Sequence, residues 1–314
     1  MRPFRSLAPL LVCLGLAAAC VGGATPSEGP GSPARAAASF PFTLVDDAGV
    51  RVTLDRQPQR IVTFAPSNTE IVYALGLGDR LVGVSGRYDD YPPEAKRVEE
   101  IGGAGDFGAD PNIEKVVALQ PDLMLAISGG DEWKAELRDL GVPVFTINAT
   151  DFDDLLHDIR TVGRLTGAVG SAASLTERMA SVAKDIEGAA ASSARVSCFF
   201  EVFYPPLTTV GPDTFIADLL NRAGCDSVSA GAKRDYPEWS VDDLVRRQPA
   251  VYLVSSESGV SPGDVAKRPG FDAIEAVARG DVVLIDSDLI SRPGPRVVQG
   301  LQELATALHQ EAGL

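Results

Sequence analysis

The stretch Asn112–Pro121, NIEKVVALQP, returns in the second half of the chain as Ser240–Pro249, SVDDLVRRQP. Each copy begins with a residue that caps helices, carries an acid two places later, and ends in Gln-Pro. The proline ends the helix because it pushes the preceding residue out of the right-handed helical region. An apolar strand pattern follows each copy, at 122–127 and 250–255. The repeat therefore predicts two similar units, each with a short helix ahead of a buried strand.

The segments after the repeat also match between the two halves. Each half continues with a helical stretch, a glycine (Gly141 or Gly280) and a further strand, at 144–147 or 282–285. Strands that alternate with helices are typical of parallel sheets. We therefore expect an α/β fold with two similar lobes, each built on a central, largely parallel sheet.

Ahead of the first copy, the sequence predicts a hairpin, a strand and a helix. Residues 42–54 alternate around Asp47–Gly49, as in a hairpin, and Arg60–Phe64 is a strand pattern. Ser67–Glu70, SNTE, has the form of a capping box, which predicts a helix that starts there and runs to Leu75.

A long helix is expected between the two halves. Apolar residues recur from Leu175 to Ile186 at intervals of four, three and four, and Ser174–Glu177, SLTE, has the form of a cap for part of this stripe. The chain has 314 residues, enough for two lobes. The expected boundaries are 40–168 for the N-terminal lobe, 169–193 for the connecting helix and 194–314 for the C-terminal lobe.

The first residues predict export. Two arginines precede a nearly apolar run, 7–19, which has the length of a signal-peptide core and is short for a membrane span. The run ends in LAAAC, which resembles the bacterial lipobox, where the cysteine is lipidated. We expect a signal peptide at 1–19 and a lipid anchor on Cys20, with an ordinary signal peptide as the alternative. The protein would then face the periplasm or the cell exterior.

Residues 20–39 are rich in Gly, Pro, Ser and Ala and predict a disordered tether. The lobes retain two cysteines, Cys198 and Cys225. Outside the cytosol such a pair forms a disulfide or stays as two buried thiols, and the sequence leaves both possibilities open.

The composition argues against several classes of function. The formal net charge is −15, which disfavours a nucleic-acid partner. Two histidines, His157 and His309, are too few for a histidine-rich metal site, so we expect no metal and no resident cofactor. Gly103–Gly108 matches G-x-G-x-x-G once, but Asp110-Pro111 places the helix start later. An exported α/β enzyme is therefore kept only as the alternative to a binding protein.

Five segments in a fixed order carry a resemblance to a known family. They are RIVTFAPSNTEIVYALG (60–76), VGVSGRYDDYPPEA (82–95), NIEKVVALQPDLMLA (112–126), TTVGPDTFIADLLNRAG (208–224) and SRPGPRVVQGLQEL (291–304). The chain resembles the helix-bridged substrate-binding proteins of ABC importers for cobalamin, ferric siderophores and haem. The segment DYPPEA and the general pattern are most similar to the cobalamin branch. The resemblance implies a binding protein that is monomeric when free.

The resemblance also implies a small-molecule ligand between the lobes, at the carboxyl ends of the strands. Cobalamin is a mostly apolar disc fringed with amides, which needs aromatic walls and a few polar anchors. The candidate ligand-binding residues are Arg87, Tyr88, Phe107, Phe203, Tyr204, Tyr236 and Arg292. For each aromatic residue, packing in the core is the alternative.

Other positions keep the identity of the ligand open. Ile127, Leu289 and Ile290 stand where cobalamin binders of the family carry tryptophan, and Trp133 and Trp239 either compensate or pack in the core. A ferric siderophore or haem is the alternative ligand. Arginines suit an anionic chelate and a tyrosine suits haem iron. The residues available for these roles are Arg87, Arg292 and Arg296, and Tyr88, Tyr204 and Tyr236.

In this family each lobe presents a surface acid to arginines of the permease dimer. By position these acids are Glu114 and Asp242, one in each copy of the repeat. Both also fall in the first turn of a predicted helix, where the helix dipole favours a carboxylate. We expect the two acids to contact a permease.

Overall fold

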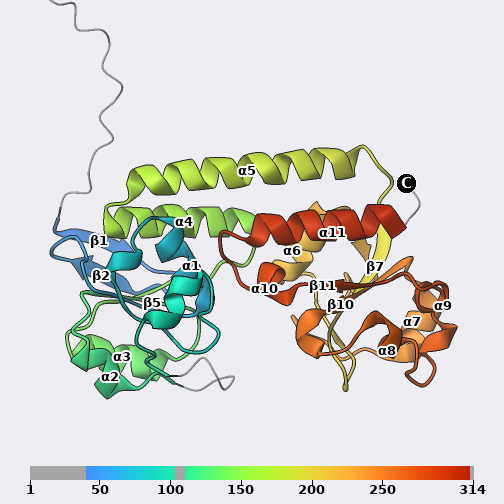
Figure 1. The fold of residues 1–314 in the computed structure, drawn as a ribbon, viewed down its shortest axis with the longest axis horizontal. Coiled ribbons are helices and arrows are strands. Elements are labelled where there is room, and N and C mark those ends of the chain that lie inside the picture. The colour runs from blue at the N-terminus through green and yellow to red at the C-terminus, as the bar shows by residue number, and fades with distance from the viewer. Residues whose placement is uncertain (1–39, 103–109, 312–314) are drawn as a thin grey trace, which may run out of the picture. The chain divides into compact units, whose positions relative to one another are not determined.

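Two parallel sheets organise the fold, one in each half of the chain (Figure 1). The computed structural model describes residues 40–102 and 110–311. In spatial order, the strands of the first sheet are β4 (Leu81–Gly83), β3 (Ile61–Phe64), β5 (Leu123–Ala126) and β6 (Val144–Thr146). Each strand of this sheet runs parallel to its neighbours.

The second sheet repeats this order and adds one strand. Its strands are β9 (Cys225–Ser227), β7 (Val196–Phe203), β10 (Val251–Ser255), β11 (Val282–Ile285) and β8 (Thr208–Thr209). The series β9-β7-β10-β11 is parallel and corresponds to β4-β3-β5-β6, whereas β8 pairs with β7 in the antiparallel sense. The prediction of two similar lobes with largely parallel sheets is confirmed.

The repeated segment folds in the same way in both lobes. It forms α2 (Ile113–Ala118) in the first lobe and α7 (Val241–Arg247) in the second. The side chains of Asn112 and Ser240 cap these helices by accepting hydrogen bonds from backbone N–H groups in the first turn. Each cap satisfies a donor that a helix start leaves without an intrahelical partner.

The two Gln-Pro pairs share an uncommon backbone conformation. Gln120 has a φ of 47° and Gln248 a φ of 44°, and no other non-glycine residue in the described ranges has a positive φ. The following proline disfavours the right-handed helical region, and both glutamines take the left-handed region rather than the extended one. The two copies of the repeat therefore share a backbone conformation as well as a sequence pattern.

The capping box expected at Ser67–Glu70 is wrong. Helix α1 (Pro66–Ala74) begins ahead of Ser67, and its N-cap residue, Ala65, makes no side-chain hydrogen bond. The carboxylate of Glu70 binds Arg296 of the second lobe instead. The SNTE segment therefore lies within the helix, and its glutamate contacts a residue far away in the sequence rather than the helix start.

Helix α5 (Val169–Ala191) is 23 residues long and runs past both halves of the chain (Figure 1). It packs on α4 (Phe152–Thr166) of the first half and on α11 (Val297–Glu311) of the second. Because α5 begins ahead of Ser174–Glu177, the prediction that this segment caps a helix is wrong.

Buried apolar side chains of both sheets join with α4, α5 and α11 in one connected core. Alternation along each strand sends neighbouring residues to opposite faces. Leu123 and Leu125 of β5 belong to this core, while Met124 and Ala126 belong to a smaller cluster with residues of α2 and α3 (Asp131–Asp139). Both sheets are therefore covered on both faces, as parallel sheets require.

The predicted hairpin consists of β1 (Phe42–Val45) and β2 (Arg51–Leu54), which pair antiparallel. Its turn carries Asp47, which lies close to the buried Asp158 of α4. Burial raises the pKa of Asp158 to about 8, and the nearby carboxylates of Asp47 and Asp154 act in the same direction.

The other α-helices complete the lobes. They are α6 (Phe215–Arg222), α8 (Pro262–Val265), α9 (Glu275–Arg279) and α10 (Ser287–Ile290). Within 40–102 and 110–311, no helix combines the length and the apolar character needed to cross a membrane.

Candidate functional site

The turn that follows β4 displays the first two predicted ligand residues, Arg87 and Tyr88. The turn closes through a hydrogen bond from the backbone N–H of Asp89 to the carbonyl of Gly86, at 2.8 Å. The Asp89 side chain is 2% exposed and accepts from the Gly86 N–H at 2.9 Å and from the Ser85 hydroxyl at 2.5 Å. Burial raises the pKa of Asp89, and these hydrogen bonds oppose the rise. Sequence reasoning missed this residue, which fixes the shape of the turn.

Arg87 and Tyr88 contact each other at the surface of this turn. The Nη2 of Arg87 donates to the phenol oxygen of Tyr88 at 2.9 Å, and the guanidinium carbon lies 4.7 Å from the ring centroid. Arg87 is exposed and Tyr88 is half-buried. The pair offers a ligand an aromatic face and a cation on one short turn.

Arg292 of the second lobe reaches the same turn. Its Nη1 donates to the carbonyl of Tyr88 at 3.1 Å and lies 3.4 Å from Asp90 Oδ1. Its Nη2 lies 2.6 Å from Oδ1 of Asp288, which belongs to the short helix α10 just before Arg292. Burial raises the pKa of Asp288, and the charge of Arg292 lowers it. The structure thus brings Arg87, Tyr88 and Arg292 together, and it pairs Arg292 with two carboxylates.

Arg296 is also neutralised by an acid. Its Nε and Nη2 bind the two carboxylate oxygens of Glu70 at 3.0 Å and 2.5 Å. The Glu70 side chain is 3% exposed, and burial raises its pKa while Arg296 lowers it. Two of the three arginines considered for an anionic chelate, Arg292 and Arg296, therefore already hold carboxylates of this chain.

The predicted aromatic residues of the second lobe fall into two groups. The ring of Tyr204 packs against Phe271, with centroids 5.5 Å apart, and under the guanidinium of Arg268, at 4.1 Å. Phe203 and Tyr236, in contrast, are 50% and 56% exposed. Tyr204 therefore takes the core-packing alternative, while Phe203 and Tyr236 keep surface free for a ligand. Phe107 lies outside the described residues.

Phe203 and Tyr236 belong to one antiparallel ribbon. Phe203, at the end of β7, pairs with Thr208 of β8, and Thr208 bridges to Glu238 on its other side. Tyr236 lies in the bend two residues before Glu238. The segment that carries Tyr236 therefore runs beside β8, the strand that pairs with the end of β7.

The positions where cobalamin binders carry tryptophan differ in exposure, and the two tryptophans of this chain lie elsewhere. Ile127 follows β5 and is 42% exposed, whereas Ile290 is fully buried. Trp133 is buried against Phe64, at a centroid distance of 5.0 Å, and Trp239 packs beside Phe199 at 6.4 Å. Neither tryptophan replaces an aromatic wall of the site, and Ile127 contributes an exposed apolar surface at a strand end.

The two acids of the repeat are exposed on the first turns of their helices. Glu114 lies on α2 and Asp242 on α7. Neither carboxylate has a hydrogen bond or ion pair with the residues that the structure describes. An outside partner can therefore reach both acids without breaking a bond within the chain.

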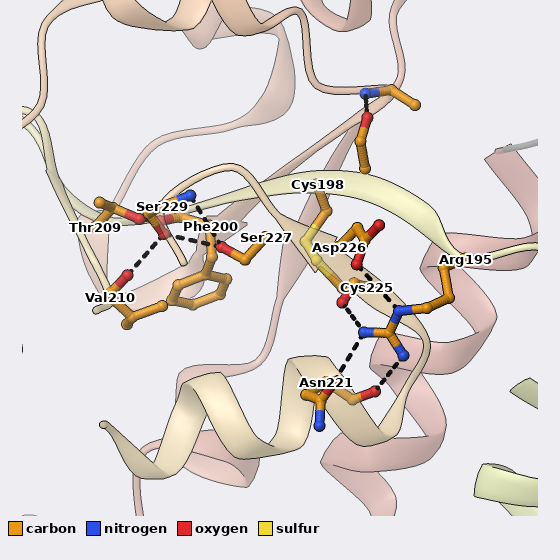
Figure 2. The surroundings of a disulfide bond; sticks show 12 residues. Arg195, Cys198, Phe200, Thr209, Val210, Asn221, Cys225, Asp226, Ser227 and Ser229 are labelled. Carbon is orange, nitrogen blue, oxygen red and sulfur yellow. Dashed lines mark hydrogen bonds and ion pairs between the residues drawn. A yellow bond between two sulfur atoms is a disulfide. The ribbon is translucent and has the colours of Figure 1, made fainter. Parts of the chain in front are cut away.

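A disulfide joins Cys198 of β7 to Cys225 of β9, with a Cα–Cα distance of 5.8 Å (Figure 2). Beside it, Arg195 donates to Asp226 Oδ1 at 3.1 Å, to Asn221 Oδ1 at 2.8 Å and to the carbonyl of Cys225. The guanidinium is thus occupied by the chain itself and ties the end of α6 to β9.

Two cavities of the described residues lie away from the candidate ligand residues. One, of about 510 Å³, is lined by Arg195, Thr214, Asp226 and their neighbours. The other, of about 400 Å³, lies between the hairpin turn and residues 128–131. Neither includes any of the predicted ligand-binding residues.

Comparison with known proteins places this chain in a family. Residues 61–289 match the periplasmic binding protein family, and the chain belongs to that family. An uncharacterized ABC transporter substrate-binding lipoprotein of Bacillus subtilis is 36% identical over 281 residues, which cover 87% of each chain. A cobalamin-binding protein of Halobacterium salinarum is 30% identical, covering 96% of this chain and 83% of the relative.

The solved structures agree with this assignment. The periplasmic vitamin B12 binding protein BtuF of Vibrio cholerae has a TM-score of 0.72 and 25% identity, with coverage of 82% of this chain and 99% of that one. These relatives are binding proteins of transport systems. The prediction of a binding protein rather than an enzyme is confirmed.

Proposed function

We propose that this periplasmic binding protein serves an ABC importer and that its ligand is a corrinoid such as cobalamin. The ligand binds between the 86–91 turn of the first lobe and the exposed rings of the second, Phe203 and Tyr236. The names and coverage of the Halobacterium and Vibrio relatives support this assignment.

The pairing of the arginines is the observation that carries the choice of ligand. A ferric chelate with several negative charges needs uncompensated cations in its site. Arg292 already faces Asp288 and Asp90, and Arg296 holds Glu70. A carboxylate within hydrogen-bond distance offsets most of the field of an arginine. The rest of the proposed ligand surface is apolar, aromatic and polar, with Arg87 as its exposed cation, which suits a disc fringed with amides better than a ligand with several negative charges.

Haem is a second candidate because of one contact. The guanidinium of Arg87 donates to the phenol oxygen of Tyr88 at 2.9 Å. Phenol oxygen is a known ligand of haem iron. Tyr88 is favoured over Tyr204 for this role, since Tyr204 is packed under Arg268.

Delivery follows from the exposed acids and from the N-terminal sequence. Glu114 and Asp242 contact arginines of a permease dimer, one from each lobe. Cys20 carries a lipid that holds the exported protein at the membrane, and the lipoprotein name of the Bacillus relative supports this anchor.

Calorimetric titration of the full chain with cyanocobalamin, haemin and a ferric hydroxamate tests the choice of ligand. We expect cyanocobalamin to bind most tightly at a ratio near one to one. Tightest binding of haemin, lost in Tyr88→Phe, would select the second candidate. Tightest binding of the hydroxamate would contradict the argument from the paired arginines.

A further inference from the structure

Glu70 and Arg296 form an ion pair between the two lobes. Glu70 lies on α1, directly after the first strand of the first sheet, and Arg296 directly precedes α11 in the second lobe. The pair is bidentate, at 3.0 Å and 2.5 Å, and its side chains are only 3% and 15% exposed. Separating the two side chains would leave each charge buried without its partner, which is energetically costly.

The backbone of the second lobe is shaped for this contact. Gly294 lies between two prolines, and a Cβ at this position would stand 3.3 Å from Oε2 of Glu70. Any larger residue would press on the carboxylate or displace it. The Pro-Gly-Pro sequence therefore permits the 291–296 segment to lie directly against α1.

The same segment holds the turn that displays the ligand residues. The ring of Tyr91 lies 4.0 Å from the guanidinium carbon of Arg296. Arg292 binds the carbonyl of Tyr88 and faces Asp90. One short segment of the second lobe thus contacts the 86–91 turn at three residues, while its ion pair fixes it to α1.

We propose that Glu70 and Arg296 are positioning residues for the ligand: their inter-lobe ion pair sets the spacing between the 86–91 turn and the second lobe. This proposal rests on the proposed function of the same surface. The pair does not contact the ligand. It keeps the lobes in the arrangement that binds ligand, so that breaking it lowers the population of that arrangement.

The experiment compares Glu70→Gln, Arg296→Lys and the double variant Glu70→Gln with Arg296→Met in the full chain. The double variant removes both charges, so it leaves no buried charge unpaired and guards against misfolding. Glu201→Gln is the matched control, because Glu201 and Arg268 form a buried bidentate pair within the second lobe alone, at 2.6 Å and 3.0 Å. Dissociation constants, dissociation rates, melting temperatures and hydrogen exchange are measured for all variants.

We expect the three variants of the Glu70–Arg296 ion pair to weaken cyanocobalamin binding about tenfold, as they would if the ligand-binding arrangement of the lobes fell to about a tenth of the population. Most of the change should appear in the dissociation rate. Hydrogen exchange should rise at 84–92 and 291–296 and stay constant in β10 and β11. The control should lower the melting temperature and leave the affinity of the folded protein unchanged.

Two results would overturn the proposal. One is unchanged exchange at both segments in all three variants. The other is a loss of affinity in Glu201→Gln equal to that in Glu70→Gln, which would mean that the pair acts only through stability. If the wild-type chain binds no corrinoid, the proposed ligand is wrong, and the exchange measurement still decides the role of the ion pair.

Discussion

Removing the Cys198–Cys225 disulfide should lower the free energy of unfolding by an amount that depends on the length of the loop it closes. The two cysteines are 27 residues apart in sequence, and both are at most 2% exposed. Closing a loop of this length removes about 3.5 kcal/mol of chain entropy from the unfolded state at 25 °C. We therefore expect Cys198→Ala with Cys225→Ala to lower the free energy of unfolding by about that amount.

The assay is equilibrium unfolding in urea, followed by circular dichroism. The single variant Cys225→Ala provides the control, because it also lacks the cross-link but keeps one sulfur in the core. Single and double variants should lose nearly the same stability if the cross-link is the main contribution. The hydrogen bonds of Arg195 go to a carbonyl and to side chains, not to sulfur, so they persist in both variants.

A loss below about 1 kcal/mol in the double variant would refute the chain-entropy argument for this bridge. A large loss in the double variant together with a small one in Cys225→Ala would assign the effect to packing of the sulfur atoms. Hydrogen exchange adds a local test, since the bridge encloses β8 and α6 and both should exchange faster without it.

Three further predictions concern separate parts of the molecule. Folding raises the pKa of Asp158 from its ordinary value of 3.8 to about 8, so between these values the folded state binds a proton that the unfolded state has lost. The free energy of unfolding should therefore fall as pH rises from about 5 to about 7, and urea titrations should show a slope about 1.4 kcal/mol per pH unit shallower in Asp158→Asn. Glu114→Arg with Asp242→Arg should retain the dissociation constant for the ligand and abolish uptake in cells, and normal uptake would refute a docking role. Phe203→Ala should weaken ligand binding by about tenfold, about 1.4 kcal/mol, at an unchanged melting temperature, whereas Tyr204→Ala should lower the melting temperature; calorimetry and thermal melts would expose the reverse pattern.

The two-lobe fold could be predicted from the sequence because local patterns signal its helices and strands. The two copies of the helix-strand repeat contain their own caps and stops, and Asn112 and Ser240 act as the sequence predicts. Residues that act over long distances were harder. Glu70 matches a capping box, but its partner Arg296 is 226 residues away, and no local pattern signals that contact.

The site could be predicted only in part, for the same reason. Arg87, Tyr88 and Arg292 were identified from their segments, and the structure brings them together. Tyr204 follows a strand as a pocket residue would, yet Arg268 and Phe271 from a later segment cover its ring. The pairing of Cys198 with Cys225 also needed the structure, since it depends on β7 and β9 being neighbours.

The choice of a corrinoid is the central claim, and one spectrum tests it directly. The full chain is mixed with excess cyanocobalamin, passed through a desalting column, and its visible spectrum is recorded against the protein concentration. The account predicts a retained corrin spectrum at close to one molecule per chain. A colourless protein after desalting would contradict it and would redirect the assignment to a ferric ligand at Tyr88.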